Sequence, residues 1–216
     1  MAKKSDTKRQ HILTVAAQAF QELGFERTTM SEICARMGGS KATLYNYFPS
    51  KEVLFFEIMY LSTEAEFQAV HSAIDPSTDD IVTSLQNFGE RLLTILYSPQ
   101  VRANRHLSIS ESGHSELGRL VYERRVQRSQ DLVADFIRKA MDHGKLRQAD
   151  AVVATKHLYS LLEAELIDRF LFQLLEEVSR DEIRQVTARA VAVFMAAYGP
   201  AGKIAPETRG ASRQEP

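Results

Sequence analysis

Residues 29–51 read TMSEICARMGGSKATLYNYFPSK, a run that predicts two short helices joined by a glycine turn. Thr29 stands three positions before Glu32, which is the spacing of a capping box: the threonine oxygen accepts from the N3 amide and the glutamate reaches back to the cap. The glycine pair at 38–39 ends the first helix, and Ser40 caps the second. Two such helices after a preceding helix form a helix-turn-helix unit, here at about residues 29–48.

Helical periodicity extends on both sides of this unit. A first helix is predicted at about 6–23, ended by Gly24, and a fourth at about 50–70, capped by Ser50. The apolar side chains expected to form a shared core are Ile12, Phe20, Ile33, Leu44 and Phe48.

The second helix of a helix-turn-helix enters the major groove of DNA. The face of residues 40–48 that points away from the core carries almost no acidic group to repel phosphate. Lys41 can donate to guanine, Asn46 can bond adenine, and the methyl group of Ala42 can touch that of thymine. Ser40 and Lys41 stand at the helix N-terminus, where free amides and the helix dipole favour anions.

Residues 39–54, GSKATLYNYFPSKEVL, resemble the signature of the TetR/AcrR family of bacterial regulators. The matching features are the Leu-Tyr pair, the aromatic residue two places after that tyrosine, and the lysine that opens the fourth helix. The strong resemblance covers about residues 8–60. A weaker one, at ELGRLVYE (116–123), is similar to a segment of the AefR-like branch. Gly39 departs from the pattern, because many members have valine or isoleucine there.

The resemblance implies which residues contact DNA. It implies base-edge contacts from Lys41, Ala42 and Asn46, and phosphate or sugar contacts from Thr29, Thr43, Tyr45, Tyr47 and Lys51. For Tyr45 an alternative stays open, in which the ring packs in the core and only the hydroxyl is exposed. The basic side chains near the N-terminus grip the DNA backbone or are merely solvated: Lys3, Lys4, Lys8 and Arg9.

The rest of the chain is predicted to be helical too, which gives an all-α fold of about nine helices. A linker is expected at 71–80, then helices at about 79–97, 99–110, 114–142, 150–176 and 179–198, the last begun by a Ser179/Glu182 capping box. From Gly199 onward the sequence is rich in proline and glycine, which predicts a disordered tail at 199–216. The expected domains are a DNA-binding domain at 1–52 and a helical ligand-binding and dimerisation domain at 53–198.

The last two helices carry broad apolar faces, which contain Leu158, Leu161, Leu162, Leu166, Phe170 and Leu174 and then Val186, Ala190, Val193, Phe194 and Ala197. The resemblance implies that these helices pair with their copies in a four-helix dimer interface. Composition alone would allow them to be ordinary core. A palindromic operator read by a two-fold dimer gives an independent reason to expect a homodimer.

A ligand pocket in this domain would be mostly apolar with a few converging polar groups. The candidate side chains are Phe67, Phe88, Leu92, Arg102, His106, Ile109, Tyr122, Val126, His157 and Glu163. Each has an alternative as a core or surface residue, and the arginines near 102–105 and 124–128 can be solvated or paired with acids. We expect Leu54, Ile58 and Leu61 to hold the fourth helix against the reading head, so that it moves as a unit.

Composition excludes several other classes. The formal net charge is −1, with eight lysines and arginines against six acidic residues in 1–60, so a basic contact is confined to the N-terminal end. Cys34 is the sole cysteine and is expected to be an inert core residue rather than a thiol sensor; the pattern fits a reducing cytoplasm. No membrane segment, metal-ligand spacing, cofactor motif or catalytic constellation occurs.

The sequence therefore predicts a transcriptional regulator, most simply a ligand-responsive dimeric repressor released from its operator by a small apolar or amphipathic effector. Repression rests on the resemblance alone. Two alternatives are a constitutive DNA-binding protein without a ligand, which the large apolar second domain disfavours, and a helical enzyme, which the missing catalytic groups disfavour.

Overall fold

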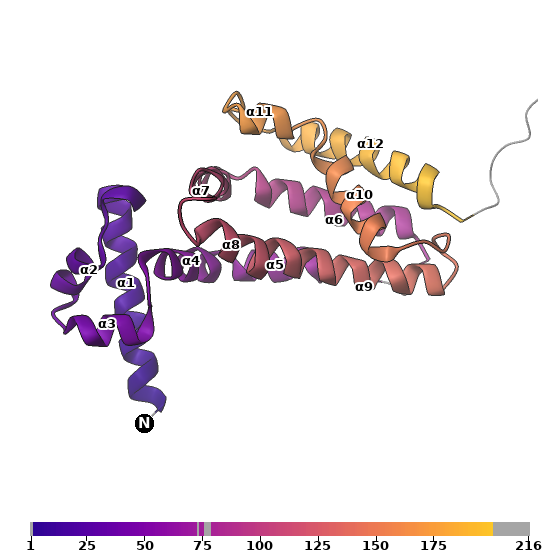
Figure 1. Ribbon diagram of the computed structural model, residues 1–216. Helices are drawn as coiled ribbons and strands as arrows, with labels where there is room; N and C mark the ends of the chain where they lie inside the picture. The colour runs from indigo at the N-terminus through magenta and orange to yellow at the C-terminus, as the bar shows by residue number, and fades with distance from the viewer. Residues whose placement is uncertain (1, 73, 76–78, 201–216) are drawn as a thin grey trace, which may run out of the picture.

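The structure, a computed structural model, describes residues 2–72, 74–75 and 79–200. The regular secondary structure in this part is helical, which confirms the all-α prediction (Figure 1). The elements are α1 (Ala2–Arg27), α2 (Met30–Met37), α3 (Lys41–Tyr47), α4 (Lys51–Ser62), α5 (Glu64–His71), α6 (Ile81–Leu96), α7 (Pro99–Ser110), α8 (Leu117–Val121), the π-helical segment η1 (Tyr122–Gln127), α9 (Arg128–Asp142), α10 (Ala151–Glu163), α11 (Ile167–Leu171) and α12 (Arg180–Tyr198). No helix in these ranges is long and apolar enough to cross a membrane.

The molecule is elongated, with α1–α3 gathered at one end as a reading head (residues 2–48) and the remaining helices stacked beside it (Figure 1). The core of the head contains Ile12, Ile33 and Leu44, all with no exposed surface, together with Phe20 and Phe48. The predicted packing of the recognition helix on the first two helices is therefore confirmed. Gly24 leaves the helical conformation at φ 78°, as a helix-ending glycine does, but helical turns continue to Arg27.

The predicted helix starts are confirmed in the threonine and serine half of each cap. The backbone N–H of Glu32 donates to Thr29 Oγ1 at 3.1 Å, that of Thr43 to Ser40 Oγ at 3.2 Å, and that of Val53 to Ser50 Oγ at 3.2 Å. The glutamate half of the two capping boxes is wrong. The Glu32 carboxylate accepts from Arg36 at 2.8 Å, and Glu182 accepts from Arg169 at 2.6 Å, because charged partners compete better than a backbone amide.

The fourth helix is not continuous to residue 70, as expected, but breaks at Thr63 into α4 and α5. The Ser62 and Thr63 hydroxyls both donate to the Met59 carbonyl at 2.9 Å and compete with the helical ladder there. The Tyr60 carbonyl accepts at 2.9 Å from Arg125, a residue of η1. Of the three residues expected to hold this helix to the head, Leu54 is buried in the head core and Ile58 is partly buried against it. Leu61 is 49% exposed and does not hold the helix to the head.

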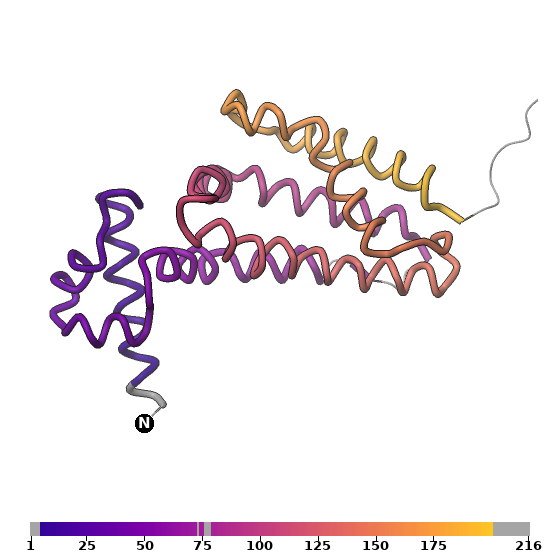
Figure 2. Tube along the Cα trace, in the orientation of Figure 1, coloured from indigo at the N-terminus to yellow at the C-terminus, as the bar shows by residue number. Residues whose placement is uncertain are grey.

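Two further predicted helices are divided. The one expected at 114–142 begins at Leu117 and passes through the π-helical turn of η1 before α9; Figure 2 shows this stretch as one continuous coil. The one expected at 150–176 turns between α10 and α11, where the Leu166 N–H donates to the Glu163 carbonyl at 2.9 Å, and ends at Leu171. Neither site contains proline or glycine, so the sequence carries no local signal for the break.

The body core lies between α6, α9, α10 and α12. Gly89 of α6 allows this close packing, since a Cβ there would lie 2.7 Å from the side chains of Leu162 and Thr187. The expected linker at 71–80 is shorter, because His71 still belongs to α5 and Asp80 caps α6 by accepting from the Thr83 N–H at 3.0 Å. Residues 73 and 76–78 lie outside the described residues, and so does the expected disordered tail from 201 onward.

The head and the body share an apolar contact. Leu117, at the start of α8, has no exposed surface and belongs to the head core with Leu54 and Phe56 of α4. The core around the helix-turn-helix thus extends past the predicted boundary at residues 52–53. That boundary stays a prediction.

Candidate nucleic-acid interface and internal cavity

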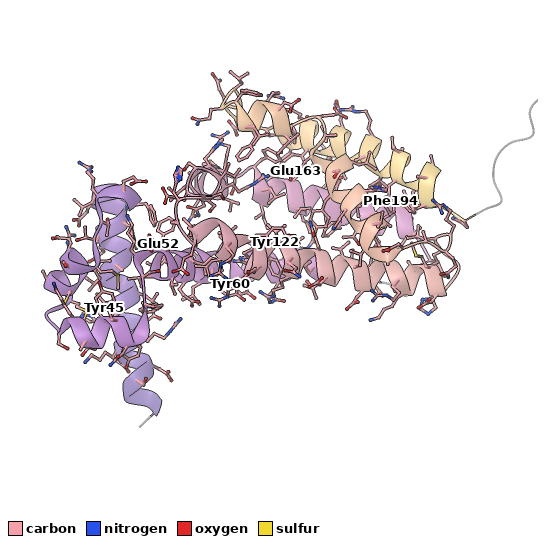
Figure 3. The ribbon with its side chains drawn as sticks, viewed as in Figure 1. Tyr45, Glu52, Tyr60, Tyr122, Glu163 and Phe194 are labelled. Atoms are coloured by element: carbon pink, nitrogen blue, oxygen red, sulfur yellow. The ribbon has the colours of Figure 1, made fainter. Side chains whose placement is uncertain are left out.

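The recognition helix α3 exposes the side chains that the sequence assigns to bases. Lys41, Ala42 and Asn46 are exposed, whereas Leu44 on the opposite face is fully buried. Figure 3 labels Tyr45 on this helix, at the end of the molecule remote from Phe194 of α12. The face can therefore approach a duplex without first rearranging the head.

The two tyrosines of α3 differ in their surroundings. Tyr45 is 48% exposed, so the alternative in which its ring packs in the core is wrong. Tyr47 is half-buried against the head core, and its hydroxyl lies 3.2 Å from Ser5 Oγ of α1. A phosphate contact from Tyr47 would share its hydroxyl with Ser5.

Two smaller assigned side chains already serve as helix caps. Thr29 is exposed, with its oxygen accepting from α2, and Ser40 Oγ lies 2.9 Å from the Thr43 hydroxyl in addition to its cap bond. Their hydroxyls are held at the N-termini of α2 and α3, where the local dipole favours an anion.

Lys51, assigned to phosphate, is engaged inside the head. Its Nζ donates to the Phe25 carbonyl at 3.1 Å and to the Glu26 carbonyl at 3.4 Å, and lies 4.3 Å from the centre of the Phe25 ring. The lysine therefore ties the start of α4 to the end of α1, and it must leave these carbonyls to reach DNA.

Of the N-terminal basic residues, Arg9 forms a 2.5 Å ion pair with Glu57 of α4 and lies over the Phe48 ring, which is an internal role. Lys8 is exposed. The side chains of Lys3 and Lys4 lie outside the described residues. Cys34 is buried in the head core, with its thiol donating to the Gly39 carbonyl at 3.2 Å.

The body contains a cavity of about 220 Å³ between α4, α5, α6, α7, α10 and the α8–η1–α9 helix. Most of its wall is apolar, and α4 and α5 contribute the aromatic side chains Phe56, Tyr60 and Phe67. A cavity with a mostly apolar wall and a few polar groups is the kind of site that small molecules occupy.

One polar part of the wall is a hydrogen-bonded chain. His71 Nδ1 lies 2.7 Å from the Phe67 carbonyl, His71 Nε2 lies 2.8 Å from Ser129 Oγ, and Ser129 Oγ lies 2.5 Å from the Tyr159 hydroxyl. Burial lowers the pKa of His71, as do the nearby charges of Arg128 and Arg125, so the ring favours its neutral form. Burial raises the pKa of the Tyr159 hydroxyl, which keeps its proton.

A second polar group lies one turn along α10. Glu163 Oε1 accepts from Arg105 at 2.7 Å and from the Tyr97 hydroxyl at 2.9 Å, and the Arg105 guanidinium lies 4.4 Å from the Phe170 ring centre. Burial and the Glu163 charge raise the pKa of Tyr97. Arg105 Nη1 is buried without a hydrogen-bond partner in the part of the chain described, so it is an unused donor beside the cavity.

Three arginines pair with acidic residues where η1 and α9 meet α4 and α5, and one of them, Arg125, lines the cavity. Arg128 and Arg125 both pair with Glu64, at 2.9 Å and 3.2 Å, and Arg124 pairs with Glu57 at 2.7 Å. The hydrogen bond from Arg128 holds the pKa of Glu64 at about 2. These arginines are therefore paired with acidic residues. The sequence left this possibility open beside that of an anion-binding site.

Four of the ten predicted pocket residues line the cavity: Phe67, Leu92, Val126 and Glu163. The other six do not. Phe88 is fully buried behind the wall, where its ring packs on His71 and Tyr159; Arg102 donates to the Leu175 and Glu176 carbonyls; His106 stacks on Phe170; His157 bonds the Tyr198 hydroxyl; Ile109 and Tyr122 are about half exposed.

Sequence reasoning missed His71, Arg105, Arg125, Ser129 and Tyr159 as wall residues. His71 was assigned to a linker. Tyr159 follows the fully buried Leu158, and a polar side chain within an apolar helix was the available signal for it.

Comparison with known proteins agrees with this geometry. Residues 12–58 match the family described as bacterial regulatory proteins, tetR family, and residues 83–200 match the C-terminal domain of AefR-like transcriptional repressors. The chain belongs to the TetR family of DNA-binding transcriptional regulators, with an AefR-like C-terminal domain. It resembles the HTH-type transcriptional regulator AcrR of Shigella flexneri, with 28% identity over 193 residues that cover 81% of this chain and 85% of the relative.

Two solved structures have the same arrangement. A TetR-family regulator from Mesorhizobium loti has a TM-score of 0.76 and 27% identity, over 90% of this chain and 98% of the other. The flavonoid-responsive regulator FrrA has a TM-score of 0.73 and 28% identity, over 91% of this chain and all of the other.

Proposed function

We propose that this regulator is a ligand-responsive repressor that binds a palindromic operator as a homodimer and leaves it when a small apolar or amphipathic molecule fills the cavity. The observation that carries the proposal is the position of α8. Val121 at its end lines the cavity, and Leu117 at its start is buried in the head core. One short helix therefore contacts both the candidate ligand site and the reading head.

On the DNA side, we assign base contacts to Lys41, Ala42 and Asn46, which share the exposed face of α3. Contacts to phosphate and sugar are assigned to the residues around this face, which are Thr29, Ser40, Thr43, Tyr45, Tyr47 and Lys51. Backbone contacts of this kind fix the register of the protein, and the base contacts supply specificity.

A homodimer through α10 and α12 is supported by the exposed apolar surface of α12. Ala188, Ala192 and Val193 are all exposed, although the opposite face of the same helix is buried in the body core. Small side chains allow a second helix to approach closely, and a two-fold dimer would present two recognition helices to a palindromic operator.

An effector is supported by the cavity and by the similarity to FrrA, which responds to flavonoids. Filling the cavity would displace α4, together with the head packed on it, relative to the body, and the two recognition helices would no longer match major grooves roughly 34–36 Å apart.

The experiment is selection of operators from random duplex DNA with the full chain, followed by anisotropy titration of the selected duplex against aromatic molecules. We expect two inverted half-sites centred roughly 10 base pairs apart, and release of the duplex by at least one molecule. Selected sequences without two-fold symmetry would contradict the dimer. If every molecule bound and none altered DNA affinity, the protein would bind DNA constitutively.

A further inference from the structure

The direction of the hydrogen-bonded chain in the cavity wall is fixed by the Phe67 carbonyl. A carbonyl oxygen can only accept, so His71 Nδ1 carries the proton in its 2.7 Å contact with that oxygen. In the neutral ring, His71 Nε2 is then an acceptor, and the Ser129 hydroxyl donates to it at 2.8 Å.

The same reasoning reaches Tyr159. Because the single hydroxyl proton of Ser129 is donated to His71, the Ser129 oxygen must accept in the 2.5 Å contact with Tyr159. The Tyr159 hydroxyl therefore donates to Ser129, and what remains on its oxygen is a lone pair. Since Tyr159 lines the cavity, this polar point of the wall is an acceptor without a proton to give.

The surroundings select a neutral partner for that lone pair. Glu163 follows Tyr159 by four positions on α10, so both lie on the cavity face of the helix, one turn apart. At this point of the wall an anion would meet the Tyr159 lone pair, whereas an O–H group can donate to it. Glu163 is paired with Arg105, and the unpaired Arg105 Nη1 is left to donate to an acceptor atom elsewhere on the ligand. The rings of Phe56, Tyr60 and Phe67 form an aromatic wall in the same cavity, which suits a flat ring.

We propose that the cavity takes a neutral aromatic alcohol and that Tyr159 accepts the hydrogen bond from its hydroxyl group. The inference rests on the proposed function, in which this cavity is the ligand site. It adds the chemical class of the ligand and the side chain that selects it.

The test uses 2-naphthol, which can donate, and 2-methoxynaphthalene, which has the same rings and can only accept. The chain contains no tryptophan, so naphthyl emission can be followed directly in titrations of the full-length protein. The quantity compared is the affinity ratio of 2-naphthol to 2-methoxynaphthalene in the parent, Tyr159→Phe and Ser129→Ala. Comparing ratios removes the difference in hydrophobicity between the probes.

We expect the ratio to be about 5-fold higher in the parent than in Tyr159→Phe, because one hydrogen bond is lost. In Ser129→Ala, the Tyr159 proton is released from its partner and can turn to the cavity. We therefore expect 2-methoxynaphthalene to bind more tightly there than to the parent. A purely structural role for the two side chains would weaken both probes together and leave the ratio unchanged.

Equal ratios in all three proteins would overturn the assignment of Tyr159 while leaving the cavity as a ligand site. Failure of both probes to bind the parent would overturn the ligand class. Operator selection tests the proposed function separately, so neither result is confused with failure of DNA binding. Circular dichroism of the variants checks that each is folded.

Discussion

Ser50 Oγ donates a 2.7 Å hydrogen bond to Glu116 Oε1, across 66 positions of sequence, and so joins the cap of α4 to the residue that precedes α8. The same Ser50 oxygen accepts from the Val53 N–H, so one hydroxyl serves the helix cap and the contact between head and body. Leu117, the next residue, is buried in the head core.

We expect Ser50→Ala to lower the free energy of unfolding by about 1–2 kcal/mol, since it removes the cap and the link. Glu116→Ala removes the link and an exposed 3.4 Å pair with Arg119 but leaves the cap, and we expect about 0.5–1 kcal/mol. In a double-mutant cycle by urea denaturation, the double variant should lose less than the sum of the two. Strict additivity would show that the contact contributes nothing to stability.

Lys51→Ala should change two measurements, because its ammonium group is shared between the head and the proposed phosphate contact. The lost carbonyl and ring contacts should cost about 1 kcal/mol of stability. The lost phosphate contact should reduce the slope of log affinity against log salt by about 1 per monomer. Lys41→Ala, on the exposed face of α3, is the matched control for the stability measurement. It should in addition lower discrimination between bases.

A destabilised Lys51→Ala protein with the parental salt slope would assign the lysine to the fold alone.

Tyr47→Phe should weaken specific and random duplexes alike, because backbone contacts carry no sequence information.

Local signals in the sequence were sufficient for the reading head. Ser40 and Ser50 act within three residues of the amides they cap, and Leu44 and Phe48 follow the helical period, so neighbours in sequence decide their positions. The break at Thr63 is different. The Ser62 and Thr63 hydroxyls contribute locally by bonding the Met59 carbonyl, but the Tyr60 carbonyl is taken up by Arg125, 62 positions from Thr63, and no pattern near residue 63 reports that contact.

The cavity was predicted less well for the same physical reason. Tyr159 and Ser129 lie 30 positions apart on helices whose apolar faces are typical of ordinary core, and only the packing of α9 on α10 joins them. Phe88, in contrast, is an aromatic residue of the kind that contacts ligands, but the His71 and Tyr159 rings pack on it.

The dimer prediction is sharpened by burial. Leu166 has no exposed surface within one chain, so a charge there would disrupt the body core and would not report on association. Val193 is 53% exposed on α12, and we expect Val193→Glu to give a folded monomer in sedimentation velocity. Leu132→Glu, 41% exposed on α9, is the matched control and should stay dimeric. A dimeric Val193→Glu protein would place the interface elsewhere.

Stability should fall with acid in two separate windows. The pKa of His71 is lowered from 6.5 by burial, so the unfolded chain takes up this proton first; stability present above pH 6.5 is lost as the pH falls below it. The pKa of Glu64 is lowered from 4.5 to about 2, so its contribution is lost between those values. In urea denaturation at fixed protein concentration, His71→Gln should flatten only the upper window. An unchanged profile would mean that His71 titrates alike in both states.

The last prediction concerns coupling between the cavity and DNA. The break at Thr63 leaves α4 as the segment that can move rigidly with the head, since Phe67 lies beyond the break, and α8 provides a second connection through Leu117. If occupancy favours the DNA-incompetent form by about 100-fold per dimer, the coupling free energy is about 2.7 kcal/mol. The same factor must weaken ligand binding when operator is present. Calorimetric titration of 2-naphthol with and without the selected operator measures it, and Glu116→Ala should reduce the factor because one connection is lost. Equal affinities with and without operator would contradict the sensor mechanism even in a protein that binds both partners.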